Sequence, residues 1–178
     1  MPPGNLSLNP IFIAACLIIY LIGDHLDGMQ AKRTGTGSAL GEFCDHYLDA
    51  FNNGIIVFMM FTVFNIHHPA AMAGVIVISY WAHMAVFYEQ FKTGWLTFER
   101  IGSLEGVLLS ALLIGLTVLE PFYALMTYRL AGTITVAEVF IAGSTLGAFM
   151  TFIQTARRMP VIMAGYWIFV MLIMVVEV

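Results

Sequence analysis

The hydrophobic positions along the chain form runs of about 20 residues, separated by short polar connections. An α-helix needs about 20 apolar residues to cross a bilayer, so each run is a candidate transmembrane helix. No soluble domain or low-complexity segment interrupts the sequence of runs. We therefore predict an all-α, polytopic membrane bundle, with residues 1–178 forming a single transmembrane domain. The six predicted spans are 10–32, 39–64, 69–91, 103–122, 134–156 and 159–178.

The composition agrees with a membrane protein, because 60% of the residues are hydrophobic and only 10% are charged. The first ten residues, MPPGNLSLNP, contain no basic segment, so we expect no cleavable signal peptide. The two cysteines, Cys16 and Cys44, are too few to indicate a disulfide framework.

The Lys and Arg residues are distributed unevenly between the connections. If the chain weaves through the membrane, Arg129 is alone on one side and the other six of the seven cations fall on the opposite side. Cytoplasmic connections are typically enriched in Lys and Arg, so this side is predicted to be cytoplasmic and both termini external. The six cations are Lys32, Arg33, Lys92, Arg100, Arg157 and Arg158.

Much of the charge is concentrated in one short stretch, GDHLDGMQAKRTGTGSALGEFCDHYLDA, which joins the first two predicted spans on the cytoplasmic side. Asp24 and Asp27 are three residues apart, which places both carboxylates on one helix face. Span two begins with a helical stripe at intervals of i, i+3, i+4 and i+7. Two antiparallel helices joined by the polar turn TGTGS can point these faces at each other. The stripe consists of Glu42, Asp45, His46 and Asp49.

Four aspartates at a membrane edge would repel each other, and each ionised group costs about 2.5–3.5 kcal/mol at membrane depth. Divalent cations remove this repulsion, and oxygen-only ligands favour Mg²⁺, Mn²⁺ or Ca²⁺ over zinc. Four carboxylates from two helices can hold two such ions, an arrangement that suits displacement at phosphorus. Gly28 and Gly41 would allow a ligand to approach the backbone. The alternatives are a solvated loop between helices, a proton relay or a cation pathway.

The stretch resembles the signature of the CDP-alcohol phosphotransferases, D-x2-D-G-x2-A-R-x8-G-x3-D-x3-D. Every spacing is kept, and the one departure is Lys32 in place of arginine, which Arg33 follows directly. The matching residues are Asp24, Asp27, Gly28, Ala31, Lys32, Gly41, Asp45 and Asp49.

The resemblance implies an integral membrane enzyme, a homodimer that uses Mg²⁺ or Mn²⁺ and has its active site at the cytoplasmic face. Such an enzyme cleaves a CDP-alcohol, releases CMP and joins the phosphoalcohol to a second alcohol in phospholipid synthesis. The resemblance also implies metal-ligand roles for Asp24, Asp27 and Asp45. Asp49 would be a metal ligand or a general base. The residues expected to surround the donor are Gly28, Ala31, Lys32, Arg33, Gly41 and Glu105.

Further residues resemble the choline/ethanolamine phosphotransferase branch, in which CDP-choline or CDP-ethanolamine is the donor and diacylglycerol the acceptor. The similarity lies in DGMQAKRT and LGEFCDHYLD, and in SLEGVLLSALL with Glu105 at the cytoplasmic edge. Glu42 and His46 would then act together as the general base that activates the acceptor. They are four residues apart, so the carboxylate can orient the imidazole. Alternatively, His46 only positions Asp49.

Two other functions stay open from the sequence. Within the family, CDP-diacylglycerol could donate its phosphatidyl group to a soluble alcohol. From a different class, a divalent-cation transporter could use the same carboxylates. Family members usually have one more span before the motif helix, so we expect this sequence to lack an N-terminal helix. Glu89 is a candidate for lining the donor pocket or for a solvated helix end. Tyr80 is a candidate for a cage around a quaternary ammonium or for an interfacial aromatic residue.

Overall fold

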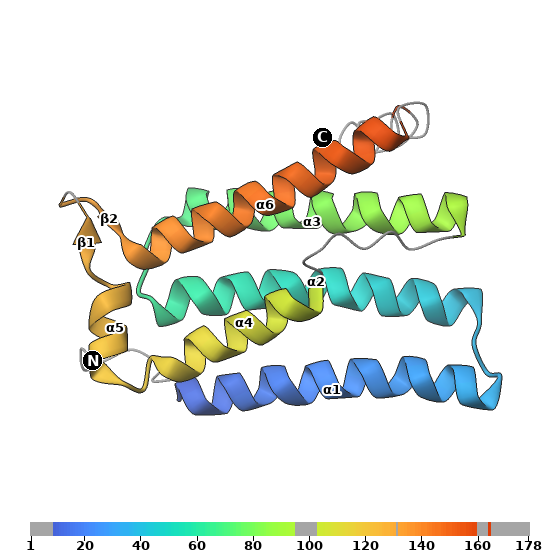
Figure 1. The fold of residues 1–178 in the computed structure, drawn as a ribbon, viewed down its shortest axis with the longest axis horizontal. Coiled ribbons are helices and arrows are strands. Elements are labelled where there is room, and N and C mark those ends of the chain that lie inside the picture. The colour runs from blue at the N-terminus through green and yellow to red at the C-terminus, as the bar shows by residue number, and fades with distance from the viewer. Residues whose placement is uncertain (1–8, 95–102, 131, 160–163, 165–178) are drawn as a thin grey trace.

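The computed structural model describes residues 9–94, 103–130, 132–159 and 164 of the chain. Helices dominate these residues, and a small antiparallel hairpin joins the last two helices (Figure 1). The elements are α1 (Pro10–Thr34), α2 (Ala39–Val63), α3 (Pro69–Thr93), α4 (Ser103–Leu116), α5 (Glu120–Met126), β1 (Arg129–Leu130), β2 (Ile134–Thr135) and α6 (Val136–Arg158).

Local capping signals set the ends of the long helices. Pro10 occupies the first turn of α1, and Gly35 ends that helix in the left-handed conformation with φ 66°. Ser38 then caps α2, where its side chain accepts a hydrogen bond from the backbone N–H of Gly41 at 3.0 Å. These signals confine the α1–α2 connection to a few residues, so the two helices run antiparallel next to each other.

The predicted span 103–122 is not one continuous helix. The chain bends by 118° between α4 and α5, and Pro121 lies in the first turn of α5. Proline has no backbone N–H and clashes with the carbonyl one turn earlier, so it prevents α4 from continuing. The 14 residues of α4 are too short to cross a bilayer alone.

Among the described residues, three helices are long and apolar enough to cross a membrane, namely α1, α3 and α6. The number becomes four if α4 and α5 together form one broken span. The prediction of an all-α integral membrane protein is therefore confirmed, whereas six spans are not supported. The predicted span 159–178 lies almost wholly outside the described residues.

Helix α2 has 25 residues, as many as α1 and α3, but it is not among the helices that are apolar enough over a membrane-crossing length. Residues 42–53 of α2 carry the acidic stripe and two further amides. The same polar residues that make α2 a candidate for chemistry thus reduce its hydropathy as a membrane span. They are Glu42, Asp45, His46, Asp49, Asn52 and Asn53.

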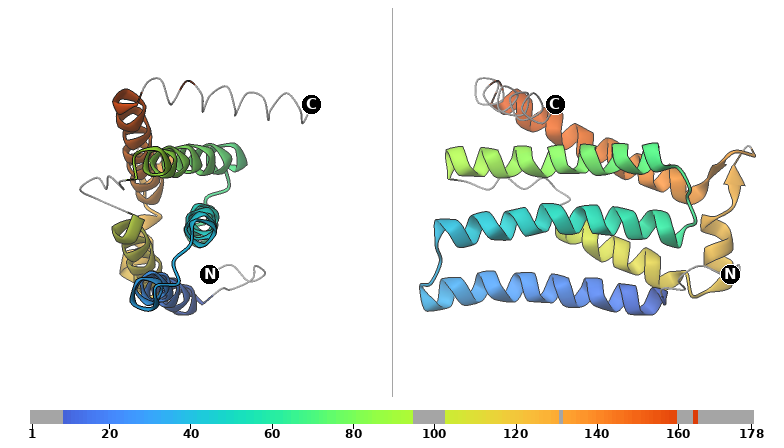
Figure 2. Two further views of the ribbon diagram at one scale, coloured as in Figure 1. Left: turned by 90° about the vertical axis from the view of Figure 1, so that its right-hand side faces the viewer. Right: turned by 180° about the vertical axis from the view of Figure 1, so that it is seen from behind.

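Helix α2 lies between α1 and α3, as two views of the ribbon agree (Figures 1 and 2). Helix α1 packs chiefly on α4, and α3 packs on both α6 and α2, whereas α1 and α2 have few direct contacts with each other. The larger hydrophobic core joins the first half of α1 to the second half of α2 and includes Ile13, Leu17, Ile56 and Met60. The other halves of α1 and α2, which carry the acidic stretch, lie outside that core.

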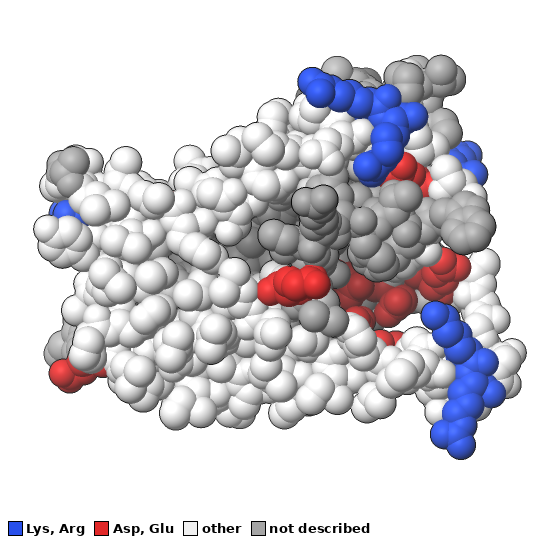
Figure 3. Space-filling view, in the orientation of Figure 1, with Lys and Arg blue, Asp and Glu red and all other residues white. Residues whose placement is uncertain are grey.

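The cationic residues gather at one end of the bundle. This end contains the last turns of α1, α3 and α6, whereas Arg129 lies on β1 at the other end. Acidic side chains fill a hollow in the same half of the molecule (Figure 3). The cations in these last turns are Lys32, Arg33, Lys92, Arg157 and Arg158, and Arg100 lies outside the described residues.

Candidate functional site

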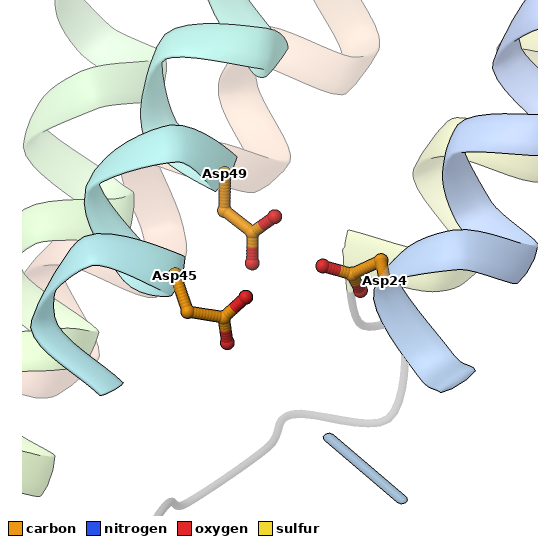
Figure 4. Close-up of side chains that lie close together, drawn as sticks. All are labelled: Asp24, Asp45 and Asp49. Carbon is orange, nitrogen blue, oxygen red and sulfur yellow. The ribbon is translucent and has the colours of Figure 1, made fainter. Parts of the chain in front are cut away.

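A pocket of about 320 Å³ lies between α1 and α2, in the half of the bundle that carries the cations. Carboxylate oxygens of Asp24, Asp45 and Asp49 lie within 4.8 Å of one another. Figure 4 shows Asp24 pointing from α1 toward Asp45 and Asp49, which project from α2. The residues that line the pocket are Tyr20, Gly23, Asp24, Asp27, Asp45, Leu48, Asp49 and Asn52.

Helical spacing accounts for the way each helix contributes to this pocket. Asp24 follows Tyr20 by four residues on α1, and Asp45 precedes Asp49 by four on α2, so each pair lies on one helix face. The tight turn between Gly35 and Ser38 brings the two faces together. Because α1 packs on α4 and α2 on α3, the space between α1 and α2 is free for a polar pocket.

The fourth predicted metal ligand, Asp27, lines the same pocket but is not one of the three converging carboxylates. It lies three residues beyond Asp24, closer to the end of α1. The structure therefore brings oxygen atoms of three of the four motif aspartates within 4.8 Å of one another and leaves the fourth aspartate at the pocket wall.

The three converging carboxylates have little compensating positive charge. In the described part of the chain, no Lys or Arg pairs with them, and the one ion-pair contact is His25 Nδ1 with Asp24 at 3.8 Å. Three like charges this close repel each other unless a cation or protons neutralise them. Oxygen atoms as the only donors, together with this uncompensated charge, fit a hard divalent cation such as Mg²⁺ or Mn²⁺.

The structure adds two polar residues that the sequence reasoning missed. The hydroxyl of Tyr20 on α1 donates a hydrogen bond to Oδ1 of Asp49 on α2. Asn52 lines the pocket from α2, three residues after Asp49. Both could have been found by extending the acidic stripes one helical turn toward the middle of each helix.

Glu42 and His46, which were predicted to act together as the general base, contact α3. Glu42 accepts a hydrogen bond from Nε2 of Gln90 at 2.7 Å. The His46 ring stacks on the ring of Phe87 with centroids 4.1 Å apart and planes almost parallel. Neither residue lines the aspartate pocket, and no hydrogen bond links the two within the described residues.

The other residues expected around the donor are not among those that line the pocket. Gly28 is exposed, and a side chain added there would meet no atom within 4 Å, so packing does not require glycine at this position. The space beside Gly28 is open to a ligand. Lys32 and Arg33 are exposed in the last turn of α1, beside half-buried Ala31. Two further exposed residues are Gly41 in the first turn of α2 and Glu105 in the first turn of α4.

Glu89 and Tyr80 contact neighbouring helices. Glu89 is only 5% exposed, and its two carboxylate oxygens each accept a hydrogen bond of 2.9 Å from the guanidinium of Arg158 on α6. Tyr80 packs directly over Gly54 of α2, where an added Cβ would lie 2.2 Å from its hydroxyl oxygen. Glu89 is thus part of a buried link between α3 and α6, and Tyr80 part of a close approach between α2 and α3.

Fold and site together define a helical integral membrane protein with a carboxylate pocket at one end. The chain is 30% identical over 109 residues to an uncharacterised CDP-alcohol phosphatidyltransferase class-I family protein of Schizosaccharomyces pombe, covering 58% of this chain and 27% of that protein. It is 31% identical over 102 residues to class-I family protein 1 of Dictyostelium discoideum, covering 53% of this chain and 25% of that protein.

A third relative is the CDP-diacylglycerol–serine O-phosphatidyltransferase of Encephalitozoon cuniculi, which is 43% identical over 49 residues. This match covers 28% of the chain and 12% of the relative. The chain thus spans about a quarter or less of the length of the curated relatives it matches. No family model matches the chain, and no solved structure matches it either. The first two relatives are named for the family whose signature the motif resembles, and none of the three is named for the choline/ethanolamine branch.

Proposed function

We propose that this chain is a membrane CDP-alcohol phosphotransferase that releases CMP from a CDP-linked donor and passes the phosphoalcohol to a second hydroxyl in phospholipid synthesis. The observation that carries the proposal is the meeting of Asp24, Asp45 and Asp49 from two helices, within 4.8 Å, at the family's motif spacing. The names of the relatives support the same class of reaction.

In this proposal, Asp24, Asp27, Asp45 and Asp49 hold one or two Mg²⁺ or Mn²⁺ ions. The metal would supply the positive charge that binds the donor diphosphate and stabilises the departing phosphate oxygen. The fit rests on the donor set itself, which offers carboxylate oxygens and no nitrogen or sulfur among the three converging residues. Gly28 leaves open space beside the backbone, and the exposed Lys32 and Arg33 in the last turn of α1 would attract the anionic donor.

The transfer forms a bond between the acceptor oxygen and the β-phosphorus of the donor and breaks the bond from that phosphorus to CMP. The acceptor hydroxyl must lose its proton to a nearby base. Asp49 lines the pocket and is the nearer candidate, while Glu42 and His46 contact α3. We propose that Asp49 accepts the proton and that Glu42 and His46 shape the acceptor side of α2.

For the substrates, we propose a CDP-choline-like or CDP-ethanolamine-like donor and a lipid hydroxyl such as diacylglycerol as acceptor. The sequence around Glu42 and His46 and the segment that begins at Glu105 support this direction. The serine phosphatidyltransferase relative favours the second candidate, in which CDP-diacylglycerol is the donor and a soluble alcohol the acceptor. Both directions cleave the same kind of diphosphate and release CMP.

We further propose that the pocket opens at the cytoplasmic face. The positive-inside rule supports this orientation, because the cations in the last turns of α1, α3 and α6 lie at the pocket end of the bundle. The homodimer rests on the family resemblance alone, since the structure describes a single chain.

The deciding experiment measures CMP release by the full chain in lipid nanodiscs with Mn²⁺. One series combines CDP-choline or CDP-ethanolamine with diacylglycerol, and the other combines CDP-diacylglycerol with serine and other soluble alcohols. Asp45→Asn, which removes one converging carboxylate, is the inactive control. CMP release in either series supports the proposal and identifies the direction. The absence of CMP release, combined with Mn²⁺ flux into proteoliposomes, would instead establish a cation transporter.

A further inference from the structure

The hydrogen bond from Tyr20 to Asp49 crosses the pocket from α1 to α2. Tyr20 lies one helical turn before Asp24, so its hydroxyl reaches the pocket on the side nearer the middle of the bundle. The side chain is half-buried and lies outside the motif that the family resemblance covers. It is therefore a pocket residue without an assigned role.

A carboxylate group on a flexible side chain needs a partner if it is to hold one orientation beside two like charges. Asp49 has two oxygens, and Tyr20 bonds one of them, Oδ1. The carboxylate held in this way lies with an oxygen within 4.8 Å of oxygens of Asp24 and Asp45. A hydrogen bond to a ligating carboxylate fixes its orientation, and loss of such a partner typically costs 10–100-fold in metal affinity or activity.

The packing of the helices makes this contact more important. Helices α1 and α2 have few direct contacts with each other, and the larger core joins them at their far halves. The carboxylates of α1 and α2 must nevertheless stay within a few ångströms to act together. The Tyr20–Asp49 hydrogen bond is a direct link between the two helices at the pocket itself.

We infer that Tyr20 is a positioning residue, which holds the Asp49 carboxylate toward Asp24 and Asp45 so that the three bind one divalent cation together. The inference rests on the metal site of the proposed function and extends it to a residue outside the motif. Tyr20 acts through Asp49.

The test compares Tyr20→Phe with Tyr47→Phe. Tyr20→Phe removes only the hydroxyl and keeps the ring. Tyr47→Phe makes the same chemical change at an exposed residue of α2 that does not line the pocket. Mn²⁺ binding is measured by calorimetry on the full chain in detergent, without substrate. We expect the Mn²⁺ dissociation constant of Tyr20→Phe to rise about 10–100-fold, while that of Tyr47→Phe stays within about twofold of the wild type.

Two further readouts separate positioning from support of the fold. Without metal, Tyr20→Phe should unfold near the wild-type temperature, and its Tm should rise less than that of the wild type on adding Mn²⁺. In the CMP-release assay, a higher Mn²⁺ concentration should restore much of the lost rate. An unchanged or tighter Mn²⁺ affinity in Tyr20→Phe would overturn the inference and leave the proposed function standing.

The remaining outcomes keep the two proposals distinct. If the wild type binds no Mn²⁺, both the metal site and the role of Tyr20 are wrong. If the wild type binds Mn²⁺ with the expected loss in Tyr20→Phe but releases no CMP from any donor, the role of Tyr20 holds and the transferase function is wrong.

Discussion

Replacing Asp45 with asparagine should change the stability of this protein in opposite directions with and without metal. The substitution keeps the size and polarity of the side chain and removes one of three charges whose oxygens lie within 4.8 Å of each other. Without metal, the loss of repulsion should stabilise the variant. With metal, the variant should gain less than the wild type, because it has lost a ligand.

The size of the effect follows from the geometry. Two unit charges 4.8 Å apart repel by about 1 kcal/mol in a water-like dielectric and by about 3 kcal/mol at an effective dielectric constant of 20. Asp45 is partly exposed, and its removal relieves two such repulsions, with Asp24 and Asp49. The lower figure for each pair gives about 2 kcal/mol in total, or a rise in Tm of about 4–8 °C for a chain of this size.

The assay is thermal unfolding in nanodiscs at neutral pH and low salt, first with EDTA and then with millimolar Mn²⁺. The matched control is Glu120→Gln, which removes an exposed carboxylate at the start of α5, away from the pocket. The control should leave both Tm values unchanged. Added salt should shrink the advantage of the metal-free variant, since exposed charges are screened within about 10 Å at 0.1 M. If Asp45→Asn and the wild type share one Tm in EDTA, or respond equally to Mn²⁺, the three carboxylates do not form a repelling metal site.

Three further predictions concern residues that make contacts between helices outside the pocket. Gly54→Ala should destabilise the protein by about 1–3 kcal/mol, because the added methyl group overpacks against Tyr80. In a thermal unfolding series with the double mutant, Tyr80→Ala should relieve part of that loss. If the effects of the two substitutions on stability simply add, Gly54 and Tyr80 are not in close contact. Glu89→Gln should destabilise the protein by about 1–3 kcal/mol, because Arg158 loses a charged acceptor, and an unchanged Tm would show that the ion pair contributes nothing. His46→Ala should lower the rate of CMP release much less than Asp49→Asn does, because His46 stacks on Phe87 of α3 and does not line the pocket; a loss of about 10²–10⁴-fold would instead assign the proton transfer to His46.

The α1–α2 part of the fold could be predicted from sequence because its signals are local. The apolar run that begins at Pro10 and the cap residues Gly35 and Ser38 bound helices that the structure places at nearly the predicted positions. The break before Pro121 had an equally local cause that a search for long apolar runs overlooks. The span predicted over residues 39–64 is not supported, because the polar residues of α2 leave it too little apolar length to cross a membrane.

Sequence alone also placed the two acidic stripes, because side chains three and four residues apart share a helix face in any α-helix. It could not decide what each face of α2 would meet, since that depends on which helices become neighbours. Only the tertiary structure sets Tyr20 against Asp49 and directs Glu42 to Gln90 of α3. The carboxylates that converge do so because α1 and α2 pack on other helices and leave a polar space between them. Which helices become neighbours depends on side-chain shape and burial across the whole bundle, so the spacing of residues along one helix does not predict it.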